Sequence, residues 1–163
     1  MPPTVGVLVL AGVPGKAYCK VLEALVRASG APLMCLTDLS LEDLRVLRMV
    51  RRELSGVPAS FHGVSDDMLR TIGAPLDARL EKACAFRMTR AQTYDVRRFF
   101  KESPELREHI GAKCDDLLCR GRAIDVVSLF IEGPRDERRA RERLAALLRY
   151  RGLPLVPAPR APR

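Results

Sequence analysis

One stretch constrains the fold of this chain more than any other, residues 5–38. It contains an apolar segment (Val5–Leu10), a turn with two glycines, a segment with helical spacing (Lys16–Ala28) and a second apolar segment (Leu33–Leu36). The order strand, helix, strand predicts a parallel sheet, because a crossover through a helix joins parallel strands. Asp38 follows the second strand, and open α/β sheets hold their ligands at the carboxyl ends of their strands. We therefore expect a functional site near Asp38.

The chain has 163 residues, 47% of them hydrophobic, which is enough to bury a core of its own. No run approaches the roughly 20 apolar residues of a transmembrane helix. Met1-Pro2-Pro3 lacks the basic start of a signal peptide. Five scattered cysteines predict free thiols in a reducing compartment. We expect an intracellular protein without a membrane partner, nuclear if the source is eukaryotic.

Apolar spacing divides the rest of the chain. Helices are expected from Ser40 to about Ser55, over 76–86 and 89–101, and from Pro104 through Leu118, with an edge strand at 59–63. Ser40 is the expected N-cap of the first helix, and Ser65-Asp66-Asp67 is expected to cap a further brief helix that runs through Ile72. Tyr94 and Phe99 are expected on faces that can bury, and 122–131 is either a helix or a strand. The predicted organisation is an α/β domain over 1–133 with a parallel sheet and flanking helices, an arginine-rich helix over 134–152 and a disordered Pro/Arg tail over 153–163.

The charge balance favours a polyanionic partner. The chain has a formal net charge of +8 and a pI near 9.7, which supports affinity for DNA but dictates no fold. Four arginines on the helix that begins at Ser40 lie opposite its apolar face, and they are the predicted DNA-binding residues: Arg45, Arg48, Arg51 and Arg52. The arginines near the C-terminus could add to such a surface. The alternative is a solvated arginine-rich helix face and a basic tail.

The glycine turn is a candidate phosphate-binding loop. Gly12, Gly15 and Lys16 follow a predicted strand and precede a helix, as in a Walker A loop. That motif needs a glycine where Leu10 stands and a hydroxyl residue where Ala17 stands. A tight turn is therefore the competing interpretation, and nucleotide binding is an alternative function.

Acidic residues follow the second predicted strand and form a candidate metal site. Asp38 lies at the strand end, and Glu42 and Asp43 lie in the first turn of the next helix. Mg²⁺ takes one or two protein carboxylates together with water and phosphate oxygens. The alternative is that Glu42 and Asp43 complement the helix dipole while Asp38 caps the turn.

The order of these signals resembles the Toprim domain of topoisomerase VI A subunits and of their relatives that make meiotic DNA double-strand breaks. The resemblance covers roughly residues 5–131. It rests on the glycine turn, on Pro32-Leu33-Met34-Cys35-Leu36-Thr37-Asp38, on Phe61 to Leu69, and on Arg122-Ala123-Ile124-Asp125.

The resemblance implies a Toprim-like, Rossmann-like fold and Mg²⁺ as cofactor, but the matching residues are incomplete. Asp38 matches the first residue of the family's Asp-x-Asp, whereas Ser40 stands at the second. The family's metal-binding Glu would lie before Val5. Its nucleophilic tyrosine belongs to a winged-helix domain, and none of the three tyrosines here matches it. Glu42 could partly replace the missing ligand.

We therefore expect a DNA-associated, catalytically degenerate domain that does not cut DNA by itself, or a non-catalytic subunit beside an intact partner. A second hypothesis is a protein-interaction module whose contact surfaces are the apolar helices of 103–131 and the proline tail. The third is a nucleotide-binding protein with a deviant phosphate loop.

Overall fold

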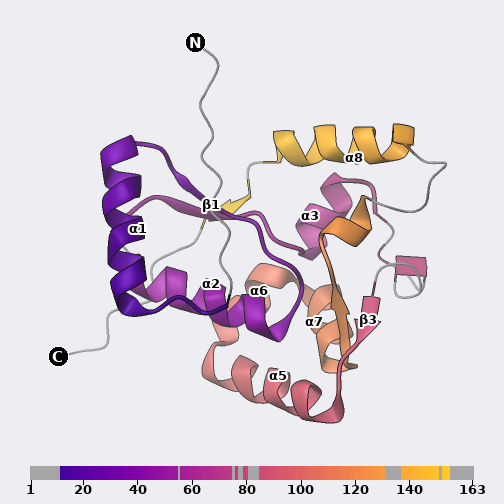
Figure 1. The fold of residues 1–163 in the computed structure, drawn as a ribbon. Coiled ribbons are helices and arrows are strands. Elements are labelled where there is room, and N and C mark those ends of the chain that lie inside the picture. Colours follow the sequence, from indigo (N-terminus) through magenta and orange to yellow (C-terminus); the bar gives the residue numbers. More distant parts are fainter. Residues whose placement is uncertain are drawn as a thin grey trace.

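The computed structural model describes residues 12–54, 56–74, 76, 79–80, 85–130, 137–150 and 152–154. Helices flank a small sheet with parallel strands, which confirms the α/β class (Figure 1). No helix of this described part is long and apolar enough to cross a membrane. The predicted strand Val5–Leu10 and the tail beyond 154 lie outside the described residues.

The elements are α1 (Lys16–Ser29), β1 (Leu33–Cys35), α2 (Leu41–Glu53), β2 (Ala59–Phe61), α3 (Asp66–Thr71), β3 (Ala85–Arg87), α5 (Arg90–Glu102), α6 (Pro104–Ile110), α7 (Ala112–Cys119), β4 (Arg122–Ile124), the 3₁₀ turn η1 (Val127–Leu129), α8 (Glu137–Arg149) and β5 (Leu153–Pro154).

The main sheet has the strand order β1-β2-β5. β1 and β2 are parallel, with Met34 opposite Ser60, and α2 connects them. The strand-helix-strand unit with parallel strands is therefore β1–α2–β2. We expected such a unit earlier in the chain, over Val5–Leu36. β5 is antiparallel to β2, so the prediction that 59–63 forms an edge strand is wrong within the described sheet. The prediction of a disordered tail is also wrong for Leu153 and Pro154, because backbone pairing with β2 holds them.

Two helix predictions in the second half of the chain are corrected. Phe86, expected at the end of a helix, lies in β3, which pairs antiparallel with β4. The single helix expected from Pro104 through Leu118 is two helices, α6 and α7. They separate at Gly111, whose φ of +86° is in the left-handed region that side chains rarely adopt. The segment 122–131, for which we expected either a strand or a helix, supplies both β4 and η1.

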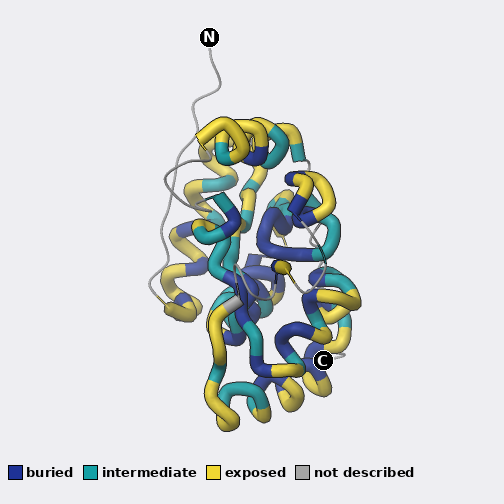
Figure 2. Tube along the Cα trace, turned by 90° about the vertical axis from the view of Figure 1, so that its right-hand side faces the viewer, coloured by how far each residue is buried: buried dark blue, intermediate teal, exposed yellow. Residues whose placement is uncertain are grey.

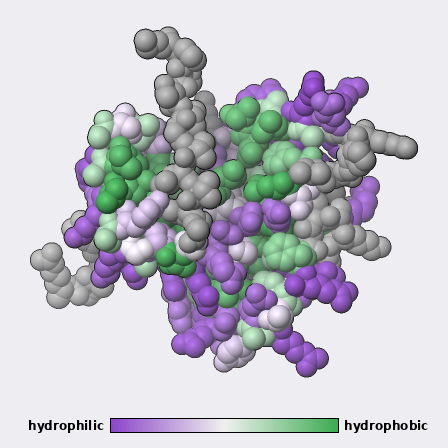
Figure 3. All heavy atoms as spheres, viewed as in Figure 1, coloured by the Kyte–Doolittle hydropathy of each residue, from purple (hydrophilic) through white to green (hydrophobic). Residues whose placement is uncertain are grey.

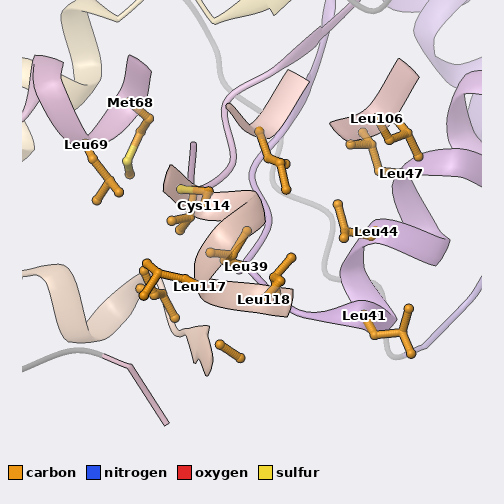
Figure 4. Packing of buried hydrophobic residues seen from close by; sticks show 14 of the residues in the cluster. Leu39, Leu41, Leu44, Leu47, Met68, Leu69, Leu106, Cys114, Leu117 and Leu118 are labelled. Atoms are coloured by element: carbon orange, nitrogen blue, oxygen red, sulfur yellow. The ribbon is translucent and has the colours of Figure 1, made fainter. Parts of the chain in front are cut away.

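α2 contributes to two hydrophobic clusters. Leu41, Leu44 and Leu47 are each 1% exposed and pack in the main core with residues of α5, α6 and α7 (Figure 4). Val50 and Leu54, at the end of the same helix, pack in a smaller cluster beneath α1. Figure 2 shows these buried segments inside an exposed outer layer of helix turns. The four described cysteines are free, as predicted, and two of them, Cys19 and Cys114, are buried in these clusters.

Hydroxyl side chains begin three of the helices. Ser40 accepts a hydrogen bond from the Asp43 N–H at 3.1 Å, which confirms the predicted cap of α2. Ser65 caps α3 in the same way. Thr89 and Gln92 form a reciprocal capping box at the start of α5. These caps are local interactions, so the sequence pattern alone identified the first two.

Asp66 caps a helix other than its own. Its carboxylate accepts hydrogen bonds from the N–H groups of Lys113 and Cys114, both at 2.9 Å, in the first turn of α7. A Cβ at Gly111 would lie 2.6 Å from the Asp66 carboxyl carbon, so glycine allows this approach. The hydrogen bonds join the start of α3 to the first turn of α7. From the sequence we expected Asp66 only at the start of α3, because its partners lie 47 and 48 residues away.

We predict that Asp66→Ala lowers the free energy of unfolding by about 0.5–2 kcal/mol, since two N–H donors of α7 would be left without their acceptor. Asp67→Ala is the matched control, because Asp67 lies next to it in the same helix and pairs with Arg70 at 3.5 Å. Urea denaturation of both variants measures the difference. Equal stability of the two would contradict the assigned cap.

The C-terminal segment closes onto β2 through His62. This side chain is 4% exposed, and its Nε2 lies 2.9 Å from the Ser60 hydroxyl. The ring of Tyr150 contacts it edge to face, with centroids 5.5 Å apart. Gly152 lies so close that a Cβ there would collide with the His62 ring. Burial lowers the pKa of His62 and raises that of Tyr150 to about 12.

The lowered pKa of His62 predicts a pH-dependent stability. In the unfolded chain His62 is protonated near the ordinary pKa of 6.5, whereas in the folded protein its protonation requires a lower pH. Neutral His62 therefore contributes fully to the free energy of unfolding above pH 6.5, and this contribution is lost as the pH falls below that value. Urea midpoints at about pH 7.5 and about pH 5.5, on either side of the usual histidine pKa, should show the drop, and His62→Gln should reduce it. An unchanged drop in that variant would exclude His62 as its source.

Candidate nucleic-acid interface

Asp38 lies at the carboxyl end of β1, where the sequence placed it. Its Oδ1 accepts a hydrogen bond from the Val126 N–H at 2.8 Å. The adjacent Leu39 pairs with Ile124 through two backbone hydrogen bonds of 2.8 and 3.1 Å. Asp38 therefore joins the end of the main sheet to the end of the β3–β4 ribbon.

Asp43, one of the acidic residues that follow Asp38, already has a partner at the start of α2. Asp43 accepts a hydrogen bond from Ser40 Oγ at 2.6 Å. Burial raises the pKa of Asp43, and the negative charges of Asp38 and Glu42 raise it further. Within the described residues no three or more metal-ligating side chains come together. The hydroxyl of Ser40 is used as a helix cap. Because Mg²⁺ needs only one or two protein carboxylates, Mg²⁺ binding by Asp38 and Glu42 stays a prediction.

Two of the predicted DNA-binding arginines hold α2 against α5 and α6. The Arg48 guanidinium lies 4.5 Å from the centre of the Phe99 ring, and its NH1 is 3.2 Å from Glu102. The side chain of Arg51 is 7% exposed and pairs with Glu105 at 3.2 Å. Arg48 and Arg51 each follow a buried leucine, Leu44 or Leu47, by four residues, so they share the buried face of α2. The prediction that all four arginines lie opposite the apolar face is therefore wrong for these two.

The other two arginines are also paired with carboxylates. Arg45 lies 4.0 Å from Asp95 of α5, and Arg52 lies 2.8 Å from its neighbour Glu53. Each positive charge of the predicted set thus has an acidic partner. Their role in DNA binding stays a prediction, but the structure gives three of them a role in helix packing.

We predict that Arg48→Ala lowers the free energy of unfolding by about 1–2 kcal/mol, because it removes a ring contact and an ion pair. Arg51→Ala should cost about 1–3 kcal/mol, since it empties a buried position and leaves Glu105 without this arginine. Arg52→Ala should change stability by less than about 0.5 kcal/mol. Chemical denaturation compares the three; similar small losses throughout would contradict the packing role.

The outer face of α5 carries a basic stripe. Val96, Phe99 and Phe100 are buried on the inner face, so the residues on the opposite side point to solvent. In Figure 1 α5 is an outer helix at the lower edge, and Figure 3 shows hydrophilic side chains along that edge. We define the α5 face by its exposed residues: Arg90, Tyr94, Arg97, Arg98 and Lys101.

The charges of the α5 face are largely uncompensated. Arg98 pairs with Glu102 at 3.3 Å. Arg97 donates a hydrogen bond to the Cys119 carbonyl at 3.0 Å, which leaves its charge unmatched. Among residues the structure describes, Arg90, Arg97 and Lys101 have no carboxylate within ion-pair distance. Strand β3 of the β3–β4 ribbon precedes α5 in the chain, and its exposed Arg87 lies directly opposite Arg122.

The α5 face was not among the sites predicted from the sequence. Tyr94 and Phe99 were expected on faces that can bury. Phe99 is 4% exposed, as expected, but Tyr94 is 69% exposed. The available signal was spacing: Tyr94 follows Arg90 by four residues and three cations follow Arg90 by seven, eight and eleven, which places all of them on one side of a helix.

The arginines of α8 are used differently. Arg138 and Arg141 pair within the helix with Glu142 and Glu137, at 2.9 and 2.5 Å. Arg143 is 6% exposed and donates to the Leu129 carbonyl at 2.6 Å. The predicted solvated face is therefore present, since the other arginines of α8 are exposed, and Arg143 is the exception that anchors the helix to η1.

The candidate phosphate loop precedes α1. Gly12 has a φ of +89°, which favours glycine, and Gly15 is the residue before the helix. Lys16 is exposed in the first turn. The strand expected before this loop lies outside the described residues, so nucleotide binding by Gly12, Gly15 and Lys16 stays a prediction.

No protein-family model matches the chain, and neither a curated protein nor a solved structure matches it.

Proposed function

We propose that this protein is a DNA-associated domain that binds the phosphate backbone through the α5 face and the adjacent β3–β4 ribbon, without cleaving DNA by itself. The observation that carries the proposal is the row of exposed cations on α5, three of which lack a carboxylate partner among the described residues. Exposed arginines and lysines bind phosphates and release counterions, which is the main sequence-independent source of affinity for DNA. The net charge of +8 supports the same partner.

The dimensions of the α5 face suit a nucleic-acid backbone. Arg90 and Lys101 are eleven residues apart on one helix, which corresponds to about 16 Å at ~1.5 Å per residue. That length covers several successive phosphates. The described residues place Glu102 and Asp95 at the margin, where Arg98 and Arg45 pair with them.

The proposal includes a degenerate Toprim-like domain related to topoisomerase VI A subunits. The parallel unit β1–α2–β2 and the position of Asp38 after β1 support it. Ser40 serves as a helix cap and Asp38 Oδ1 binds the Val126 backbone, so binding rather than strand transfer is the proposed activity.

We predict that the triple variant Arg90→Gln, Arg97→Gln, Lys101→Gln binds a labelled DNA at least about tenfold more weakly, with a salt slope smaller by about one for each phosphate that is no longer neutralised. The matched control is Arg138→Gln, Arg141→Gln, Arg149→Gln on α8, which removes the same net charge from another helix. Fluorescence anisotropy with single-stranded and duplex oligonucleotides, at low and moderate salt, measures both.

Two results would overturn the proposal. One is the absence of binding to either form of DNA at low salt by the unmodified protein. The other is an equal loss of affinity in the α5 and α8 variants, because it would reduce the effect to overall charge.

A second candidate function is protein interaction, and α1 supplies the observation for it. The apolar residues of α6 and α7, expected to form the contact surface, include Leu106, Ile110, Cys114 and Leu118, which are fully buried in the core. α1 instead presents an exposed apolar face with helical spacing, opposite its buried Cys19 and Leu22. Its members are Ala17, Tyr18, Val21, Ala24, Leu25 and Ala28.

We predict that Val21→Glu together with Leu25→Glu abolishes any association through this face, because burying two carboxylates opposes an apolar contact. Sedimentation equilibrium of the variant and of the unmodified protein over a range of concentrations measures self-association. If the variant and the unmodified protein are both monomeric at every concentration, α1 does not mediate self-association, and its apolar face would have to contact a different protein.

A further inference from the structure

We propose that the DNA recognised by the α5 face is single-stranded, and that Tyr94 is the surface on which a base stacks. The proposal rests on the DNA-binding function proposed above and adds the form of the ligand. Tyr94 is 69% exposed, the most exposed aromatic ring among the described residues. A single exposed ring is common on protein surfaces, and Tyr94 differs from such a ring in the charges that surround it.

The neighbours of Tyr94 are cations on both sides along the helix. Arg90 lies one turn before it, and Arg97 and Arg98 lie three and four residues after it, positions that share a helix face. The nearest acidic residue on the helix, Asp95, is turned toward Arg45 of α2. A ring with cations on each side is the arrangement that holds a base between two phosphates.

The inner face of α5 explains why Tyr94 stays outside. Val96 is 0% exposed, and Phe99 and Phe100 are 4% exposed, so the apolar positions that pack on α6 and α7 are already filled. Tyr94 belongs to neither hydrophobic cluster and is not needed to complete the core. A binding role of its ring can therefore be separated from a structural one.

A single strand suits this surface better than a duplex. In a duplex each base is stacked within the helix, and its flat face is inaccessible to a side chain on an outer helix. An unpaired base offers that face, and stacking on an aromatic ring tolerates any sequence. A second ring, Phe86, is 50% exposed on β3, the strand that leads into α5.

The test compares Tyr94→Ala with Tyr94→Phe in the full chain. The probes are a labelled oligothymidylate and a labelled duplex of mixed sequence. The unmodified protein should bind the single strand more tightly. Tyr94→Ala should weaken that binding by about 5- to 100-fold, the effect of removing one stacked base, and leave duplex binding unchanged. Tyr94→Phe keeps the ring and should stay within about twofold.

Two further readouts separate stacking from charge. The salt slope should be the same in Tyr94→Ala and the unmodified protein, because every cation that meets a phosphate is still present. The chain has no tryptophan and three tyrosines, so tyrosine emission is measurable, and its quenching by oligothymidylate should decrease in Tyr94→Phe. Thermal unfolding of both variants should match the unmodified protein, since Tyr94 lies outside both hydrophobic clusters.

The outcomes distinguish the two proposals. Duplex binding as tight as single-strand binding, or unchanged affinity in Tyr94→Ala, would overturn the stacking role and leave the DNA-binding function in place. Absence of binding to both polymers would overturn the DNA-binding function itself.

Discussion

The position of α2 between two hydrophobic clusters is the constraint on which the rest of the structure depends. Leu41, Leu44 and Leu47 bury one face of the helix against the helical half of the chain, while Val50 and Leu54 bury its end beneath α1. α2 is also the connection between the parallel strands β1 and β2. A helix that packs on both sides has little surface left for solvent, so its polar residues must find partners within the protein.

This constraint determines what the arginines of α2 do. Arg48 and Arg51 reach Glu102 and Glu105 at the end of α5 and the start of α6. Their aliphatic stems cover apolar surface, and the charged ends meet carboxylates. α5 is the opposite case, because it packs by one face only. The cations on its other face point to solvent, so the unpaired positive charge of this part of the chain lies on the α5 face.

Carboxylates join the two halves of the chain. Asp38 accepts an N–H of the loop after β4, and Asp66 accepts two N–H groups of α7. Both follow strands of the main sheet, which is where the sequence predicted chemistry. In the structure both carboxylates accept hydrogen bonds from backbone N–H groups, and these bonds hold the end of the main sheet against the second half of the chain.

The sequence by itself determined the local features, which are the caps at Ser40 and Ser65 and the apolar face of α2, since each depends on residues within a few turns of one another. Only the tertiary structure decided which strands pair, that Leu153 joins the sheet, and that Phe86 lies in a strand. It also decided which arginines are available, because the carboxylates that neutralise Arg45, Arg48 and Arg51 lie about fifty residues further along the chain. Local periodicity shows which side of a helix is polar; the packing of distant helices determines which polar side remains in contact with solvent.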